Sequence, residues 1–336
     1  MTITVYLGTG GVGKTSLAAA TALARARAGD RTLVLTTDPA HRLRTALGLE
    51  PGAPEQLVPL DPPAPAELWG AMLDVRATLD DAVRLYAKPA AVDRILNHSI
   101  YATIANSLVG MPELMAVERI DQLIRRGFEN IVVDTAPSRH ALEFLDKPMF
   151  FAGLADSAWV KLVGRAYRFA AASPFGLFSR ASVDMYARVE AILGANLVRE
   201  ILDFYSLFVS IAEGYSARAR KTVALLKDPA VTSFRIVSTP QKAVADSSYF
   251  AAELEKRGFP TGAICINRLW TETATATPAS GLEQDLMDWY GAVQASQQAA
   301  VRAVTEGHAA SIVRVPELAE DVEGIESLEQ IARFLG

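Results

Sequence analysis

The sequence predicts an α/β protein built on a doubly wound, mostly parallel sheet. Short β-branched apolar runs recur along the chain, and long helical stretches separate them, which is the alternation of βαβ units. The runs are continuously apolar, as expected of strands that helices cover on both faces. The expected strands are residues 3–7, 32–36, 68–75, 131–133, 235–238, 263–266 and 311–313. A helix from Thr15 to about Arg27, rich in Ala and Leu, follows the first strand and ends near Gly29.

Two regions interrupt this alternation. Residues 51–65 are Pro-rich and are expected to form an exposed connector. Residues 148–229 carry no strand signal and are rich in large apolar side chains, whereas an ordinary crossover needs only one helix. We therefore expect a helical subdomain at 148–229, inserted into a sheet domain of residues 1–147 and 230–336. Its aromatic residues suit either the subdomain's own core or a groove for a helical client.

Composition narrows the class of protein. The chain has 336 residues, of which 50% are hydrophobic and 21% charged, which is typical of a packed globular protein. A net charge of -5 argues against a nucleic-acid partner, because binding to phosphate backbones needs a basic face. The single cysteine, Cys265, excludes an intrachain disulfide framework and a zinc site built from several thiolates of one chain. With no visible signal peptide and no long apolar stretch, we expect a cytoplasmic protein with Cys265 as a buried, inert thiol.

The segment Gly8–Thr15 carries the strongest chemical signal. It fits the pattern G-x-x-x-x-G-K-[ST], directly after an expected strand and directly before an expected helix. Such a loop turns its backbone N–H groups toward phosphate oxygens, and the helix N-terminus adds partial positive charge. Lys14 is expected to reach the β- and γ-phosphates, and the Thr15 hydroxyl to coordinate Mg²⁺. The loop residues expected to contact the nucleoside triphosphate are Gly10, Gly11, Val12, Gly13, Lys14, Thr15 and Ser16.

Two aspartates follow expected strands at the same edge of the sheet. Asp134 ends the strand at 131–133, and in enzymes with this loop such a carboxylate holds Mg²⁺ or its water shell. Asp38 follows the strand at 32–36 and is placed to orient or deprotonate the attacking water. The alternative for both is an ordinary turn-forming or capping aspartate.

Taken together, these segments resemble the arsenite-pump ATPase family, which includes the cytosolic ATPases that target tail-anchored membrane proteins. The resemblance rests first on Gly10–Thr15, Thr36–His41 and Asp134–His140. Cys265–Leu269 is similar to the family's strand-ending segment whose Asn reads adenine, and Val315–Leu318 to its closing nucleotide-contact loop. The similarity runs from about residue 3 to residue 336 and is weakest in the expected helical insertion.

The resemblance implies a deviant P-loop ATPase of the MinD-like, SIMIBI class that works as a nucleotide-dependent dimer. It implies that Asp38 belongs to the first switch segment and that residues 134–140 form the second. It also implies that Asn267 contacts adenine, which favours ATP over GTP, and that Pro316 lines the nucleotide. A turn-forming Asn at a strand end is the alternative for Asn267.

The chain departs from the family at two places. The family's loop has a second lysine just after its first glycine, reaching across the dimer, and here that residue is Thr9. Since such a cation stabilises the transition state, we expect a substitute. Arg139 is our candidate for this catalytic cation. Arg42 is another residue at which the chain differs from its relatives. The alternative is that a related partner chain supplies the lysine. A single cysteine also leaves no thiol set for metalloid binding and no C-x-x-C pair for zinc.

The predicted function is a dimeric switch that binds and hydrolyses ATP with Mg²⁺, as a homodimer or a heterodimer with a related ATPase. It would couple hydrolysis to binding of a hydrophobic helix client or a membrane-associated partner. Two alternatives stay open: a slow regulatory or scaffold ATPase, and the ATPase subunit of an arsenite-type anion efflux pump. The sequence does not identify the client.

Overall fold

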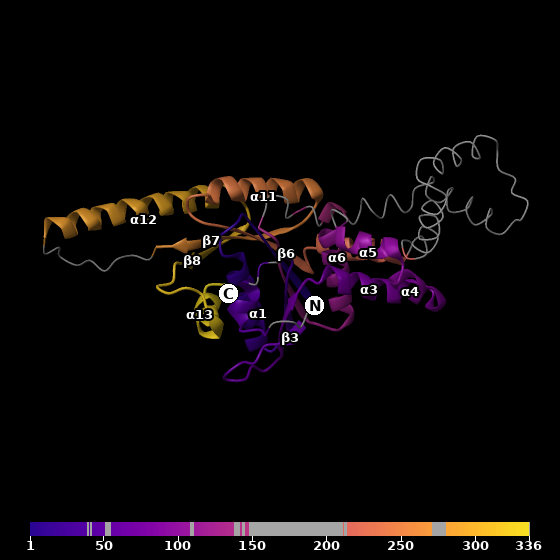
Figure 1. Ribbon diagram of the computed structural model, residues 1–336. Helices are drawn as coiled ribbons and strands as arrows, with labels where there is room; N and C mark the ends of the chain where they lie inside the picture. Colours follow the sequence, from indigo (N-terminus) through magenta and orange to yellow (C-terminus); the bar gives the residue numbers. More distant parts are fainter. Residues whose placement is uncertain are drawn as a thin grey trace, which may run out of the picture. The chain divides into compact units, whose positions relative to one another are not determined.

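An eight-stranded sheet forms the centre of the computed structural model, which describes residues 1–38, 40, 42–50, 55–107, 111–137, 142, 145–147, 211, 214–270 and 280–335 (Figure 1). Its strands are β1 (Thr2–Leu7), β2 (Thr32–Thr36), β3 (Glu55–Leu57), β4 (Leu68–Met72), β5 (Asn130–Asp134), β6 (Thr232–Ser238), β7 (Thr261–Leu269) and β8 (Ser311–Pro316). Their spatial order is β3-β4-β2-β5-β1-β6-β7-β8. Every neighbouring pair is parallel except β3 with β4. The predicted doubly wound, mostly parallel sheet is therefore confirmed.

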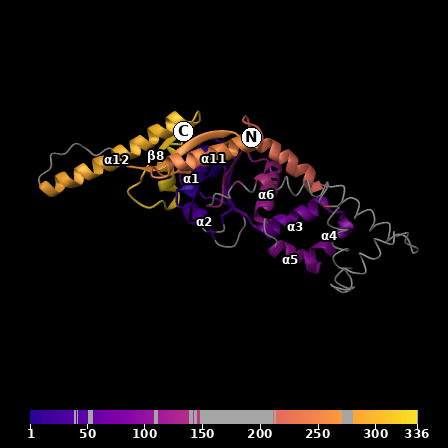
Figure 2. The ribbon, with the colours of Figure 1, turned by 90° about the horizontal axis from the view of Figure 1, so that it is seen from above.

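Helices cover both faces of this sheet. On one face, α1 (Lys14–Arg27) packs against α13 (Gly324–Ala332) and α2 (Arg42–Leu47). On the other, α11 (Ala243–Arg257) contacts α12 (Gly281–Gly307), and α12 extends beyond α11 (Figures 1 and 2). This two-sided cover is why the strand sequences are apolar throughout, and β2 and β5 are buried along their whole length.

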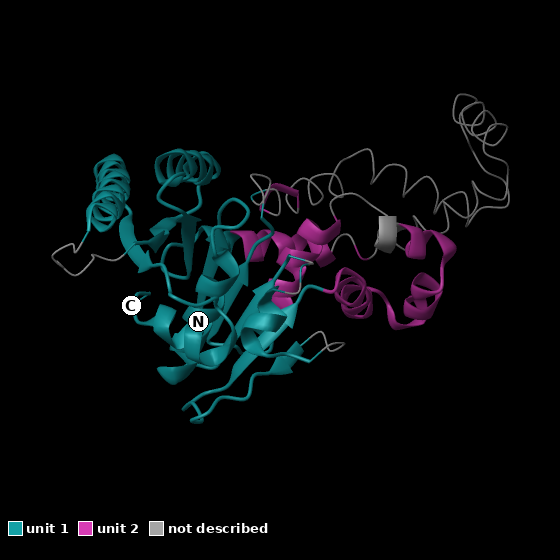
Figure 3. Ribbon diagram, turned by 60° about the vertical axis from the view of Figure 1, so that its left-hand side comes forward, with its two compact units in different colours: residues 1–73, 123–142, 224–336 teal, residues 74–122, 143–223 magenta. Residues whose placement is uncertain are grey.

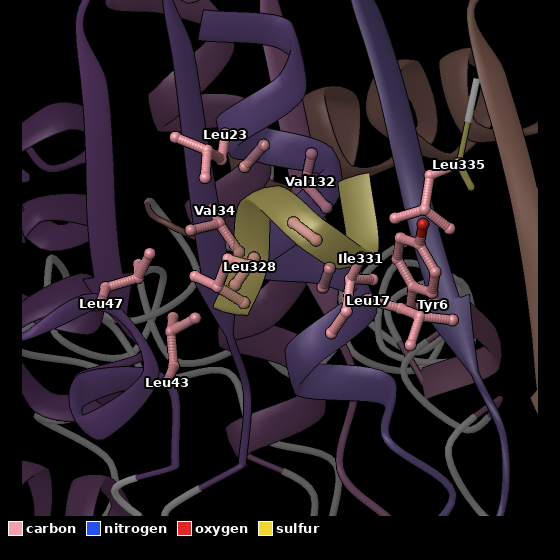
Figure 4. Close-up of a cluster of buried hydrophobic side chains, with 14 of the residues drawn as sticks. Tyr6, Leu17, Leu23, Val34, Leu43, Leu47, Val132, Leu328, Ile331 and Leu335 are labelled. Carbon is pink, nitrogen blue, oxygen red and sulfur yellow. The ribbon is translucent and has the colours of Figure 1, made fainter. Parts of the chain in front are cut away.

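The core beneath α1 brings together the two ends of the sequence. Leu17 and Leu23 of α1 are fully buried and share one cluster with Leu328 and Ile331 of α13, and Ile331 and Leu17 lie close to Tyr6 of β1 (Figure 4). Small alanines fill most of the remaining buried face of α1, which lets the helix approach the sheet closely. Because α1 is clamped between sheet and α13, the loop that precedes it has a rigid support.

Two expectations on element boundaries were wrong. The strand predicted at 68–75 ends at Met72, because the Asp74 side chain accepts a hydrogen bond from the Ala77 N–H and begins α3 (Val75–Tyr86). The connector at 51–65 contains β3, a three-residue edge strand antiparallel to β4. So short a strand forms by pairing with its neighbour, and its sequence alone carries too little signal.

The chain divides into two compact units, coloured separately in Figure 3. Unit 1 comprises residues 1–73, 123–142 and 224–336 and contains the sheet. Unit 2 comprises residues 74–122 and 143–223, and its described part includes α3, α4 (Pro89–Leu96), α5 (Ser99–Ser107) and most of α6 (Met111–Arg125). The helical insertion predicted at 148–229 lies largely outside the described residues, so its boundaries stay a prediction. In the part of the chain that the structure describes, we find no helix with the length and apolar character needed to cross a bilayer.

Candidate nucleotide-binding site

The loop between β1 and α1 is shaped by its glycines. Gly11 and Gly13 have φ angles of 76° and 91°, in the left-handed region that side chains other than glycine adopt at a cost. Gly13 is the N-cap of α1, and its carbonyl accepts the Leu17 N–H at 3.0 Å. At Gly8 the backbone runs so close to the Val237 carbonyl of β6 that a Cβ would overlap it. The loop thus curls tightly at the N-terminus of a helix, an arrangement that binds phosphate in many proteins.

Lys14 lies back over this loop. Its ammonium donates to the carbonyl oxygens of Gly8 and Thr9, both at 3.0 Å, and only 6% of the residue is exposed. Burial is the main cause that lowers the pKa of Lys14, and the carboxylates of Asp134 and Asp38 oppose that shift. The loop's own carbonyls therefore hold a desolvated cation in place at the bottom of the site.

Asp134, at the end of β5, is the buried carboxylate of the site. Its Oδ2 accepts hydrogen bonds from the hydroxyls of Thr15, at 2.8 Å, and Thr36, at 3.0 Å. Its Oδ1 is buried with no hydrogen-bond partner among the described residues. Burial raises the pKa of Asp134 to about 6. A carboxylate oxygen buried and unpaired in this way is costly, which favours a binding role for it over a purely structural one.

The segments after β2 and β5 are joined by hydrogen bonds. The Thr37 N–H donates to the Asp134 carbonyl at 2.9 Å, and the Ala136 N–H donates to the Thr37 hydroxyl at 3.1 Å. Thr36 also accepts the Asp38 N–H at 3.1 Å. A continuous path of bonds therefore leads from the Asp134 carboxylate to the backbone of Asp38, whose own carboxylate accepts the Ala40 N–H.

The opposite end of the site is formed by the ends of β7 and β8. Asn267 is buried in β7, and its side-chain amide donates to the Val12 carbonyl at 2.9 Å. A Cβ on Gly13 would overlap the same amide group. Pro316 ends β8, where the Glu317 N–H donates to the Leu269 carbonyl at 2.8 Å. The loop and the end of β7 are thus in direct contact.

A pocket of about 810 Å³ opens between these groups. Its lining includes the loop from Gly11 to Ser16, Asp38, Asn267 and Pro316. Small-molecule sites typically measure ~300–1,000 Å³, so a nucleoside triphosphate fits this volume. Gly10 lines a second pocket of about 410 Å³ beside the same loop, and Asp134 lies behind Thr15, out of the lining.

The structure therefore brings together nearly all of the residues that the sequence singles out, from the ends of five strands, β1, β2, β5, β7 and β8. Arg139 is the exception: it lies outside the described residues, so its role stays a prediction. Cys265 is buried in β7, and burial raises the pKa of its thiol to about 11. Sequence reasoning missed Thr36 as a partner of Asp134, although its place at a strand end directly before Thr37-Asp38 was a usable signal.

The first strand of the sheet leads through a glycine-rich loop and its lysine into a helix, and a buried aspartate ends the neighbouring strand. This arrangement defines a P-loop nucleoside triphosphatase. Within that class, the sequence also matches one protein family. The model of the ArsA ATPase family, described as anion-transporting ATPase, matches residues 1–336. The chain belongs to this family and is an ATP-hydrolysing enzyme.

The chain is also similar to individual proteins. The chain is 28% identical over 340 residues to Protein Rv2184c of Mycobacterium tuberculosis, covering 97% of this chain and 73% of that protein. It is 23% identical over 330 residues to ATPase get3 of Schizosaccharomyces japonicus, covering 98% of this chain and 90% of that protein. A putative arsenical pump-driving ATPase of Prosthecochloris vibrioformis is 34% identical over 154 residues, but the match spans only 44% of this chain and 36% of that protein.

Proposed function

We propose that the protein is a Mg²⁺-dependent ATPase that works as a dimeric switch, coupling ATP hydrolysis to a hydrophobic client or a membrane-associated partner. The observation that carries the proposal is the Asp134 carboxylate, which is bonded to the phosphate-binding loop through Thr15 and to the segment before Asp38 through Thr36. One buried group is therefore linked both to the place where phosphate binds and to a segment expected to respond to it.

The donors at Asp134 suit Mg²⁺, which takes oxygen ligands and keeps part of its water shell. Thr15 supplies a hydroxyl, and Asp134 supplies a carboxylate whose Oδ1 has no partner among the described residues. These two residues would hold the ion, directly or through water. When bound, Mg²⁺ neutralises charge that develops on the β- and γ-phosphate oxygens.

The chain's own groups perform the remaining steps. The N–H groups of the loop and the N-terminus of α1 bind the phosphates. The Lys14 ammonium, held by the carbonyls of Gly8 and Thr9, donates its remaining N–H to phosphate oxygens. Asp38, which faces the pocket, orients the attacking water and accepts its proton. Arg139 supplies the further cation that position 9 lacks. Asn267 and Pro316 contact the base, which favours ATP over GTP.

Movement of γ-phosphate is transmitted through the bonds around Thr36 and Thr37. If the hydrogen bond between Thr15 and Asp134 rearranges when ligand binds, the Thr36 hydroxyl, which donates to the same carboxylate oxygen, would shift with it. Thr36 also accepts the Asp38 N–H, so the water-positioning residue would move with the Asp134 carboxylate. This linkage is what a nucleotide-driven dimer needs in order to close with ATP and reopen after hydrolysis.

Two other functions remain candidates on specific grounds. A slow regulatory or scaffold ATPase is favoured by Thr9, which removes a cation from the loop. An anion pump subunit is favoured by the family's description and by the printed name of the Prosthecochloris relative. The single buried thiol of Cys265 weighs against metalloid binding through sulfur. Metalloid-stimulated turnover would support the pump, whereas stimulation by an apolar peptide would support the client.

We place the protein in the cytoplasm, in keeping with one reduced cysteine.

Asp38→Asn tests the switch. An asparagine keeps the shape but accepts no proton, so we expect turnover at least about 100-fold slower with ATP affinity nearly unchanged. Light scattering with size exclusion should show a dimer in ATP and Mg²⁺ and a monomer in ADP. Normal turnover would remove Asp38 from the mechanism, and a monomer in both nucleotides would exclude the dimeric switch. In the same assay, an unchanged rate for Arg139→Ala per ATP-bound dimer would exclude Arg139.

A further inference from the structure

Thr9, the second residue of the phosphate-binding loop, has an unusual partner. Its hydroxyl donates to Oδ2 of Asp246 at 2.9 Å, and the Ser238 hydroxyl donates to the same oxygen at 3.1 Å. Asp246 lies in the first turn of α11 and is only 3% exposed. A buried carboxylate is therefore bonded to the loop and to the end of β6 at once, and hydrogen bonds to a charged group are the stronger kind.

Thr9 also contacts Lys14 through its backbone. The Thr9 carbonyl and the Gly8 carbonyl are the two acceptors of the Lys14 ammonium. Gly8 in turn is fixed against the Val237 carbonyl, where no Cβ would fit. The side chain of Thr9 and the packing of Gly8 thus hold both peptide groups that orient Lys14, and both supports come from β6 and α11.

We propose that Asp246 is a positioning residue of the nucleotide site: through the Thr9 hydroxyl it fixes the start of the loop and thereby the direction of the Lys14 ammonium. Thr9 therefore does more than replace the family's lysine. We call its hydrogen bond to Asp246 the brace. The inference rests on the proposed role of Lys14 at the β- and γ-phosphates.

The brace predicts an effect that depends on the γ-phosphate. If Lys14 is misdirected, ATP loses more binding than ADP, because Lys14 reaches the β- and γ-phosphates and ADP has only the former. A residue that merely stabilises the fold would weaken both nucleotides alike. The ratio of the ATP and ADP dissociation constants therefore separates positioning from stability.

The experiment measures both dissociation constants with fluorescent ATP and ADP analogues in EDTA, which removes any contribution of Mg²⁺. Thr9→Val and Asp246→Ala should each weaken ATP about tenfold and ADP threefold or less, since both remove the charge-assisted hydrogen bond between the Thr9 hydroxyl and Asp246. The double variant should be no weaker than the worse single variant, because both remove the same bond. Thr9→Ser keeps the hydroxyl and should bind ATP within about twofold of the parent.

Thr305→Val is the matched control, because its hydroxyl bonds only to a carbonyl of its own helix, Val301 at 2.8 Å on α12. Lys14→Ala separates the two proposals. If Lys14→Ala keeps parental ATP affinity, the proposed phosphate site itself fails. If Lys14→Ala loses ATP while Thr9→Val keeps the parental ATP-to-ADP ratio, the brace alone is overturned. Additive losses in the double variant would overturn it too, and Thr9→Val decides the question if Asp246→Ala does not fold.

Discussion

The two ends of the nucleotide pocket are built differently. At the phosphate end, Lys14 is buried and bonded to two carbonyls of its own loop, and Asp134 is buried and bonded to Thr15 and Thr36. At the end that we propose binds the base, the base end, Asn267 makes one bond to the Val12 carbonyl, and the segment after Pro316 exposes the acidic residues at 317, 320, 321 and 323. Several buried hydrogen bonds fix the side-chain positions at the phosphate end before the ligand binds. With one such bond from Asn267, side-chain positions at the base end can adjust to the ligand.

This difference suits two separate tasks of the site, phosphate transfer at one end and base recognition at the other. Phosphate transfer needs groups held in place before reaction, because reorganising them costs rate. Base recognition needs affinity and discrimination, which a few contacts provide. Substitutions at the phosphate end should therefore separate ATP from ADP, and those at the base end should affect both nucleotides equally.

The two ends of the pocket meet at the contact between Gly13 and Asn267. Gly13→Ala should therefore disturb the phosphate end and the base end together. The new Cβ would overlap the Asn267 amide, and alanine at a φ of 91° is strained by about 1–2 kcal/mol. We expect ATP affinity to fall about 100-fold, as strain and displacement of Asn267 add. Isothermal titration calorimetry measures this directly.

Gly11→Ala is the control for strain alone. Gly11 has a similar φ of 76°, but no atom of the described residues lies within 4 Å of the position that its Cβ would take. Its effect should be about tenfold, the part due to backbone strain. If both alanine variants weaken ATP equally, the overlap with Asn267 contributes nothing and the link between the two ends is not energetic.

Asn267→Ala tests the base end by itself. Because ATP and ADP share adenine, both should lose about tenfold in affinity, and the preference for ATP over GTP should shrink. The turnover number at saturating ATP should change less than about threefold, since no transition-state contact is removed. A loss confined to ATP would show that Asn267 acts through the phosphates, by way of Val12, and would contradict the division drawn above.

Much of this site could be predicted from the sequence because its chemistry follows the ends of parallel strands. Lys14 and Thr15 are recognisable from spacing alone, and Asp134 ends an apolar run beside that loop in the sheet. The same reasoning extends to Asp38, whose strand pairs with that of Asp134. Local pattern and strand order together determine these positions.

The brace at Thr9 could not be predicted in that way. Thr9 and Asp246 are separated by 237 positions, and Asp246 follows a helix start that looks like any other acidic first turn. Similarly, β3 exists only through its pairing with β4. Contacts between distant segments depend on which helix packs over which strand end, and a single sequence carries no periodic signal for that.

The last effect concerns the stability of the ligand-free phosphate end. The pKa of Asp134 is raised to about 6 in the folded state from an ordinary 3.8, so the folded protein binds this proton more tightly than the unfolded chain. Ionised Asp134 therefore destabilises the fold above about pH 6, and this cost disappears as the pH falls toward 4. In EDTA, lowering the pH from 7 to 5 should recover about 1–2 kcal/mol of unfolding free energy through this group.

Asp134→Asn should remove that pH dependence and make the ligand-free protein more stable at pH 7, while turnover is lost. Urea unfolding at pH 7 and pH 5 measures both, and Asp285→Asn, at an exposed site on α12, serves as the control that should behave as the parent does. A variant less stable than the parent at pH 7 would mean that the bonds to Thr15 and Thr36 outweigh the burial of charge. The expected gain would mean that the ligand-free phosphate end carries an unfavourable buried charge, which the proposed binding of Mg²⁺ and ATP would offset.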